Sequence, residues 1–179
     1  MATPNTIKCL EARAWGAELK PDVTITVEDG IATLKILIEP EPQVRQTGRS
    51  GSYNPAAIKY NLWKHACQRA IKECIRLNGL ESSFPITGYV KLTAKIHVSI
   101  SRRYKTADLG NYIKAAEDMI NTCGREMDPK YKDATPKLPI WQDDRFVVEY
   151  GEGTGKYLTE EDCGWLEIII APREIKKLK

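Results

Sequence analysis

Residues Val90 to Ile100 read Val-Lys-Leu-Thr-Ala-Lys-Ile-His-Val-Ser-Ile, and this stretch decides the fold. Apolar and polar side chains alternate along it without interruption, which predicts a half-buried β-strand with one face on a hydrophobic core. A few residues further on, the apolar spacing changes to that of a helix beginning at Asp108. The strand therefore leads into a helix, and side chains at the start of that helix are held at the end of the strand.

The predicted helix runs from Leu109 to about Asn121 and has two different faces. Side chains three and four residues apart share a helix face. One face is polar and carries Asn111, Lys114 and Asp118. The other face is apolar and is made by Leu109, Tyr112, Ile113, Ala116 and Ile120. We therefore expect the apolar face to pack on a sheet and the polar face to remain available for chemistry.

The other elements are predicted from the same kinds of pattern. Two alternating stretches flank Glu28-Asp29-Gly30, a strong signal for a β-hairpin. A helix is expected between Asn54-Pro55, an N-cap followed by proline, and Asn78-Gly79, a typical stop. The expected strands are 23–27, 31–38, 90–100, 145–150 and 165–171, with 151–157 as a turn. The prediction is a single α+β domain over residues 1–179, with a small mixed sheet of about five strands and two main helices.

Carboxylates and one lysine lie close together in this organisation. Asp108, Lys114 and Asp118 belong to the helix, and Asp143 and Asp144 immediately precede a strand. Carboxylate oxygens are the ligands that Mg²⁺ and Mn²⁺ prefer, and such an ion can activate water beside a phosphate. The ordinary alternatives are a helix cap at Asp108, a solvated helix face, and a turn at Asp143-Asp144. The combination favours metal-dependent phosphodiester chemistry.

Positive charge is concentrated in two parts of the chain, between Gln43 and Arg76 and again at Arg102, Arg103 and Lys105, shortly before Asp108. Between Gln43 and Arg76 seven Lys or Arg residues stand against one acid, which leaves a local charge of +6. Basic clusters beside an acidic pocket are typical of nucleases, because phosphate contacts supply most non-specific affinity for DNA; a solvated charged face is the alternative. The predicted DNA-binding residues are Arg45, Arg49, Lys59, Lys64, Arg102, Arg103 and Lys105.

Composition excludes several other classes of protein. No apolar run is long enough to span a bilayer, and the N-terminus has no signal-peptide pattern, so we expect a cytosolic protein without a membrane partner. The five cysteines form no Cys-x-x-Cys pair, and with two histidines they make a poor zinc set. Reduced, packed thiols are therefore expected.

The central motif resembles that of the RusA family of Holliday junction resolvases. The resemblance lies in Asp108-x-x-Asn-x-x-Lys-x-x-x-Asp118, followed by a loop and by Asp143-Asp-x-x-Val147 before a strand. It extends loosely from about residue 31 to residue 171. It implies a homodimeric endonuclease that resolves four-way DNA junctions with Mg²⁺ or Mn²⁺ during recombination and repair. It implies catalytic roles for Asp108, Lys114 and Asp144, metal ligation by Asp108, Asp143 and Asp144, and supporting roles for Asn111 and Asp118.

Gly110 is the departure from the family pattern, because members of this family usually have another aspartate there. An inactivating substitution would leave a protein that binds junctions without cutting them. Alternatively, Asp128 or Asp133, in an insertion over residues 122–142, supplies the missing oxygen ligand, or water does so. A protein with an unrelated structural role is a third possibility. The sequence leaves these alternatives open.

Overall fold

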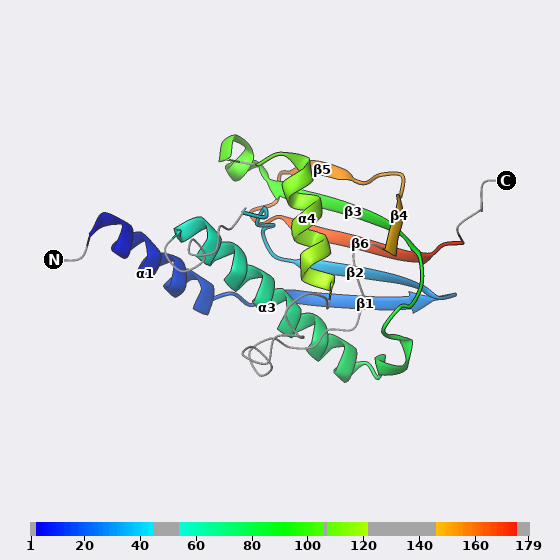
Figure 1. Ribbon diagram of the computed structural model, residues 1–179. Helices are drawn as coiled ribbons and strands as arrows, with labels where there is room; N and C mark the ends of the chain where they lie inside the picture. Colours follow the sequence, from blue (N-terminus) through cyan, green and yellow to red (C-terminus); the bar gives the residue numbers. More distant parts are fainter. Residues whose placement is uncertain (1–2, 45–53, 106, 122–145, 175–179) are drawn as a thin grey trace.

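The computed structural model describes residues 3–44, 54–105, 107–121 and 146–174, and within them the side chains of 103–105 are not described. The fold is α+β, as predicted. The described residues form three α-helices, two 3-10 helices and one mixed sheet of six strands. In chain order they are α1 (Pro4–Ala17), β1 (Asp22–Glu28), β2 (Ile31–Leu37), α3 (Pro55–Leu77), η1 (Glu81–Ser83), β3 (Val90–Ser99), η2 (Ile100–Lys105), α4 (Leu109–Ile120), β4 (Val147–Tyr150), β5 (Gly155–Thr159) and β6 (Trp165–Pro172) (Figure 1).

The β1–β2 hairpin is confirmed, with the register that its turn sequence demands. Glu28 pairs with Ile31, so the loop contains only Asp29 and Gly30. Their φ angles are 50° and 76°, and positive φ at both central residues defines the type I′ turn that two-residue hairpins favour. Glycine accepts this conformation without steric cost, and aspartate is one of the few other residues that tolerate it.

β3 is central to the sheet, whose order is β1-β2-β6-β3-β4, with β5 also paired to β3. β3 is antiparallel to β6 and parallel to both β4 and β5. The prediction of about five strands was one short, because residues 151–157 were interpreted as a turn and β5 begins inside them. Glycine and an exposed Tyr157 and Leu158 hide this strand in the sequence, and its backbone pairing with β3 defines it instead.

The prediction of two main helices was also one short. α1 begins at Pro4 after the N-cap Thr3, whose hydroxyl accepts from the Thr6 amide. It packs on α3 through small side chains, because its buried residues are Cys9, Ala12 and Gly16. A Cβ at Gly16 would meet the Leu62 side chain, so glycine permits this close helix contact. The large apolar residues Ile7 and Leu10 are 48% and 55% exposed, so the usual apolar stripe gives no signal here.

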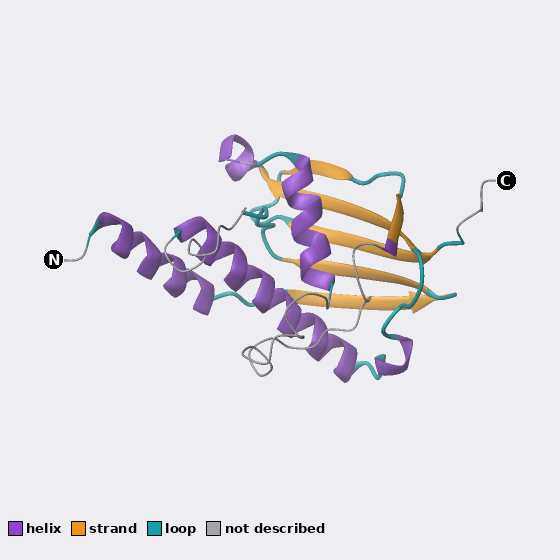
Figure 2. Cartoon of the chain, in the orientation of Figure 1, coloured by secondary structure: helices purple, strands orange, loops and turns teal. Residues whose placement is uncertain are grey.

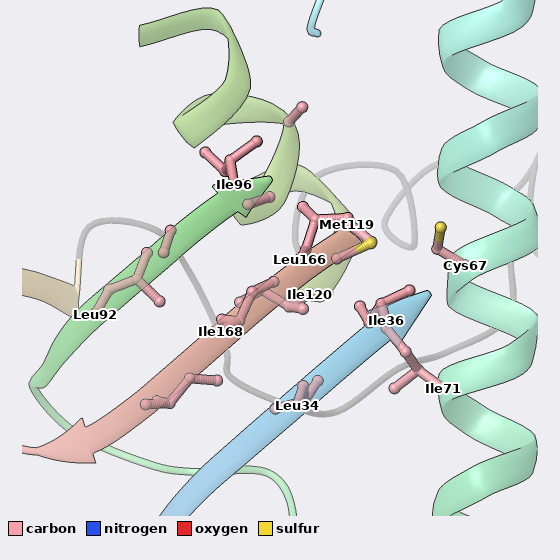
Figure 3. Close-up of a cluster of buried hydrophobic side chains, with 14 of the residues drawn as sticks. Leu34, Ile36, Cys67, Ile71, Leu92, Ile96, Met119, Ile120, Leu166 and Ile168 are labelled. Atoms are coloured by element: carbon pink, nitrogen blue, oxygen red, sulfur yellow. The ribbon is translucent and has the colours of Figure 1, made fainter. Parts of the chain in front are cut away.

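α3 and α4 cover one face of the sheet, and the opposite face carries no helix among the described residues (Figure 2). The core lies between the two layers, where side chains of β2, β3 and β6 meet those of α3 and α4 (Figure 3). Burial of this apolar surface is the main stabilising contribution to the fold. The apolar face of α4 is rotated from the prediction: Leu109 is 37% exposed, whereas Ala115, Glu117 and Met119 are buried with Tyr112, Ala116 and Ile120.

Within the described ranges, no helix combines the length and the apolar character that crossing a membrane requires.

Candidate functional site

Asp108 is the N-cap of α4, at the end of the segment that follows β3. Its backbone is extended, and its Oδ1 accepts the Asn111 amide at 3.0 Å. This contact satisfies one of the N–H groups that a helix leaves unpaired at its start. The residue is exposed. The cap therefore fixes the position of the carboxylate while leaving it in contact with solvent.

Gly110 is exposed in the first turn of α4, and no backbone requirement for glycine is evident there. It is not one of the glycines with positive φ, and a Cβ built on it would meet only Asp108 Oδ1 at 3.6 Å, an ordinary contact. Glycine in a helix is less favourable than alanine by about 1 kcal/mol. A side chain, including a carboxylate, therefore fits at position 110 beside Asp108.

Lys114, in the middle of α4, lies close to two acids of the same helix. Its Nζ is 3.5 Å from Glu117 Oε2 and 3.4 Å from Asp118 Oδ1. Glu117 is 6% exposed and also accepts from the Tyr150 hydroxyl at 2.6 Å, so this buried carboxylate is paired with the charge of a lysine and hydrogen-bonded to a phenol. Lys114 is thus a member of a built ionic cluster, and its side chain is about one third exposed.

Asp118 is fixed by two neutral donors as well as by Lys114. Its Oδ2 accepts from Gln43 Nε2 and from the Tyr60 hydroxyl, both at 2.8 Å. Burial, the charge of Asp118 and this hydrogen bond all raise the pKa of Tyr60, so its hydroxyl remains protonated and donates at any physiological pH. Asp118 therefore links α4 to α3 and to the chain that follows β2.

Residues 39–44, which we call the strap, follow β2 and precede in the sequence the segment that contains Arg45 and Arg49. The Gln43 amide donates to the Asn111 carbonyl at 3.0 Å, and its side chain donates to Asp118. The strap is therefore attached to α4 near its start, at Asn111, and near its end, at Asp118. In the sequence, Arg45 directly follows Val44 and begins the basic segment.

Glu39 anchors the other end of the strap. Its Oε1 accepts the Ser99 amide at 3.2 Å and its Oε2 accepts the Gly164 amide at 2.5 Å, which joins the end of β3 to the start of β6. Arg102 lies 2.9 Å from Glu41 and 3.9 Å from Glu39. Desolvation lowers the pKa of Arg102, but the hydrogen bond and charge of Glu41 outweigh it and leave the pKa raised. The strap is thus held by charge-assisted contacts.

Replacing Glu39 with Ala is expected to lower the free energy of unfolding by about 2–3 kcal/mol, because two part-buried backbone amides lose their acceptor. Urea denaturation of the purified variant measures the change. Glu160→Ala removes an exposed carboxylate from the loop before β6 and serves as the control, with an expected change within about 0.5 kcal/mol. Equal stability of the two variants would contradict the role assigned to Glu39.

The predicted DNA-binding residues fall into three groups. Arg102 is engaged by the strap acids, as described above. Lys59 Nζ lies 5.1 Å from the ring centre of Trp15, and Lys64 Nζ lies 5.5 Å from that of Tyr60, so these two lysines of α3 stand over aromatic rings of α1 and α3. The remaining four lie outside the described residues or side chains: Arg45, Arg49, Arg103 and Lys105.

Asp143 and Asp144 also lie outside the described residues, as do Asp128 and Asp133. The neighbouring framework is described. Val147, the first residue of β4, pairs with Val90 at the start of β3. Asp108 follows the end of β3, and the preceding carbonyl, that of Ala107, accepts from Lys156, which pairs with Ile96. Six residues of β3, roughly 20 Å, separate these two levels. An ion bound by both Asp108 and Asp144 of one chain would therefore have to bridge this separation along β3.

The fit of the described side chains to a divalent ion is incomplete. Of the three metal ligands that the resemblance implies, they include only Asp108, and nowhere in the described ranges do three or more His, Cys, Asp or Glu side chains come together as a metal-binding group.

The cluster around Lys114 also contains two residues that the sequence analysis missed, Glu117 and Tyr150. The spacing of Glu117 from Lys114 was a usable signal, whereas Tyr150 comes from a distant strand.

Comparisons of the chain with models of known protein families, with curated proteins and with solved structures found no match. Any assignment of function therefore rests on the residues and on the geometry described above.

Proposed function

We propose that this protein is a metal-dependent DNA endonuclease that resolves four-way junctions, acting as a homodimer. The observation that carries the proposal is the arrangement on α4: Asp108 caps its start, and Lys114 and Asp118 follow along the same polar face. The strap, which precedes the basic segment in the sequence, is bonded to this helix. This arrangement agrees with the chemistry that the resemblance to RusA resolvases implies. A carboxylate that can ligate a metal ion and a lysine that can offset charge on a phosphate both serve the cleavage of a phosphodiester.

Asp108, Asp143 and Asp144 are the residues proposed to hold Mg²⁺ or Mn²⁺, which supplies an activated water and offsets charge on the phosphate. Asp108 contributes a carboxylate that the helix cap holds in place. Glu117 and Asp118 hold the ammonium group of Lys114 in position. Lys114 can offset negative charge that accumulates on the scissile phosphate, since a positioned cation needs no reorganisation during the reaction.

Recognition of DNA is assigned to phosphate contacts from the basic residues. Such contacts position a protein on the backbone but carry little sequence information, so selectivity for junctions would come from shape. A homodimer presents two equivalent sites, which matches the two symmetric strands of a four-way junction.

A second candidate is a junction-binding protein that has lost cleavage. Gly110 favours this candidate. The backbone does not require glycine at position 110, so the absence of the expected aspartate there has no structural reason and agrees with a loss of cleavage. The motif would then lack one metal ligand while the basic residues remained intact. This candidate keeps the same partner and differs only in chemistry.

The experiment that separates the two candidates is a metal titration of cleavage on a labelled four-way junction beside a linear duplex of the same sequence. An endonuclease of the proposed kind cuts the junction as Mg²⁺ or Mn²⁺ is added and leaves the duplex intact. Binding of the junction without cutting at any metal concentration supports the second candidate. Failure to prefer the junction over the duplex in either binding or cleavage contradicts both.

Neutralising Arg45 and Arg49 together, as Arg45→Gln and Arg49→Gln, is expected to weaken junction binding and to flatten its dependence on salt. Each lost phosphate contact reduces the slope of log K against log salt by about one unit. Binding titrations at several salt concentrations measure this slope. Lys72→Gln, an exposed lysine elsewhere on α3, is the matched control and should change the slope less. An unchanged slope in the double variant would show that the segment does not contact DNA.

A further inference from the structure

β1 forms a long outer edge of the sheet. It has seven residues and pairs only with β2 among the described residues, whereas the opposite edge consists of the short strands β4 and β5. An edge strand presents a row of unpaired N–H and C=O groups to any other strand, and natural edges are usually interrupted by Pro, Lys or a bulge. β1 has none of these, since it reads Asp22-Val-Thr-Ile-Thr-Val-Glu28 and its register with β2 is continuous.

The hairpin determines which backbone groups of β1 point outward. In a two-residue turn the flanking residues, here Glu28 and Ile31, form a hydrogen-bonded pair. Hydrogen-bonded and non-hydrogen-bonded pairs alternate along an antiparallel ladder. Thr26 and Thr24 therefore bond to β2, while the N–H and C=O groups of Val23, Ile25 and Val27 point away from the sheet.

The sequence of this edge is symmetric about Ile25. Read in either direction it gives an acid, Val, Thr, Ile, Thr, Val and an acid. The symmetry centre is one of the residues whose backbone groups point outward. A strand with this symmetry is complementary to an antiparallel copy of itself, because the two-fold axis that pairs Ile25 with Ile25 also pairs Val23 with Val27 and Thr24 with Thr26.

We propose that two copies of this chain associate through antiparallel pairing of their β1 strands, centred on Ile25, to form one continuous sheet. In this register the outward groups of Ile25 meet those of Ile25 of the second copy, and those of Val23 meet Val27. Each such pair exchanges two hydrogen bonds. Val side chains meet on the helical side and Thr side chains on the bare side, both favourable cross-strand pairs.

The like charges at the ends, Asp22 opposite Glu28, oppose the association. They lie at the rim, where solvent screens them, since both residues are exposed. The two-fold axis is perpendicular to the sheet, so the helical layers of both copies lie on the same side. With neighbouring strands about 4.8 Å apart, the two β3 strands are separated by roughly 30–35 Å in a flat sheet. The interface gives a structural form to the homodimer of the proposed function but does not depend on nuclease activity, and only the use of this separation on a junction rests on that activity.

Disulfide crosslinking tests the register directly. Thr24 and Thr26 of the two copies form a non-hydrogen-bonded pair, with Cα atoms about 4.5 Å apart, which is within the range for a disulfide. In a Cys163→Ser background, which removes the exposed thiol of the described residues, a mixture of Thr24→Cys and Thr26→Cys proteins should give a covalent dimer on oxidation. Either variant alone should not, because its cysteines are displaced by two residues. Peptide mapping identifies the 24–26 bond, and its absence from the mixture overturns the register.

A charge pair of variants tests the interface without cysteine. Thr24→Glu with Thr26→Glu places like charges opposite each other across the seam, whereas Thr24→Glu with Thr26→Lys places opposite charges there. Both positions are exposed, and Glu at position 24 faces Lys35 within the chain, so both variants should fold. Sedimentation equilibrium should give a dimer dissociation constant at least about tenfold larger for the Glu/Glu variant than for the Glu/Lys variant. A monomeric wild type, or equal dimerisation of the two variants, overturns the proposal, and neither result depends on cleavage.

Discussion

Replacing Gly110 with Asp is expected to raise cleavage of a four-way junction at fixed Mg²⁺ by about a hundredfold or more. Groups that stabilise charge directly in a reaction act on this scale. The new carboxylate would stand beside Asp108, where a Cβ meets only Asp108 Oδ1 at 3.6 Å, so the substitution needs no rearrangement. Junction binding should change little, because the basic residues are untouched. Single-turnover cleavage with saturating protein measures the effect separately from binding.

Two control variants isolate the carboxylate. Gly110→Ala removes the conformational freedom of glycine and should raise the free energy of unfolding by up to about 1 kcal/mol without restoring cleavage. Gly110→Asn has nearly the shape of aspartate without its charge and should remain as slow as the parent. An increase in cleavage in all three variants would show that helix stability, and not metal ligation, limits the reaction. If the parent protein already cuts rapidly and no variant changes the rate, the missing ligand is supplied from elsewhere in the chain.

Asp108→Asn and Asp144→Asn are each expected to abolish measurable cleavage while leaving junction binding intact or tighter. Each change removes a negative charge from the proposed metal site. The loss lowers the affinity of the site for the metal ion and reduces electrostatic repulsion between the protein and DNA. If the parent cuts too slowly to follow, both are introduced into the Gly110→Asp protein. Cleavage and binding of the same labelled junction are then measured side by side.

Asparagine is the informative replacement at position 108 because it caps a helix as well as aspartate does. A fall in activity then reflects chemistry, and thermal denaturation should show no change beyond a few degrees. Glu81→Gln, which neutralises an exposed acid in η1, controls for the change in net charge. Full activity of Asp108→Asn would show that the metal site is not on α4. Full activity of Asp144→Asn alone would show that Asp144 does not share an ion with Asp108 across the approximately 20 Å along β3.

The parts of the fold that could be predicted are those whose pattern is local. The turn at Asp29-Gly30 fixes a hairpin, the alternation in β3 fixes a strand, and the cap at Asn54 with Pro55 fixes the start of α3. β5 could not be found in this way, because it is defined by hydrogen bonds to β3 and not by its own side chains. α1 was missed for a different reason: the face that packs consists of small residues.

The candidate site shows the same division. That Asp108 begins a helix follows from sequence, because capping depends on residues three positions apart. The hydrogen bonds that Asp118 accepts from Gln43 and Tyr60 could not be predicted, because those partners are 75 and 58 residues away in the sequence. Arg102 was predicted to contact DNA from its charge alone, and the structure pairs it with Glu41. Long-range pairing of charges is set by tertiary packing, which local pattern does not reveal.

The contact of α1 with α3 through small residues makes part of α1 less stable than the rest of the domain. Cys9 and Ala12 form a satellite cluster with Ile58 that is separate from the main core. Trp15, near the end of α1, packs against the main core, so the first turns of the helix are held by less apolar surface than its last turn. Segments with few buried apolar contacts open at a lower free energy than the whole domain. The first turns of α1 can therefore open and close while the end of the helix, the start of the edge strand and the sheet stay folded.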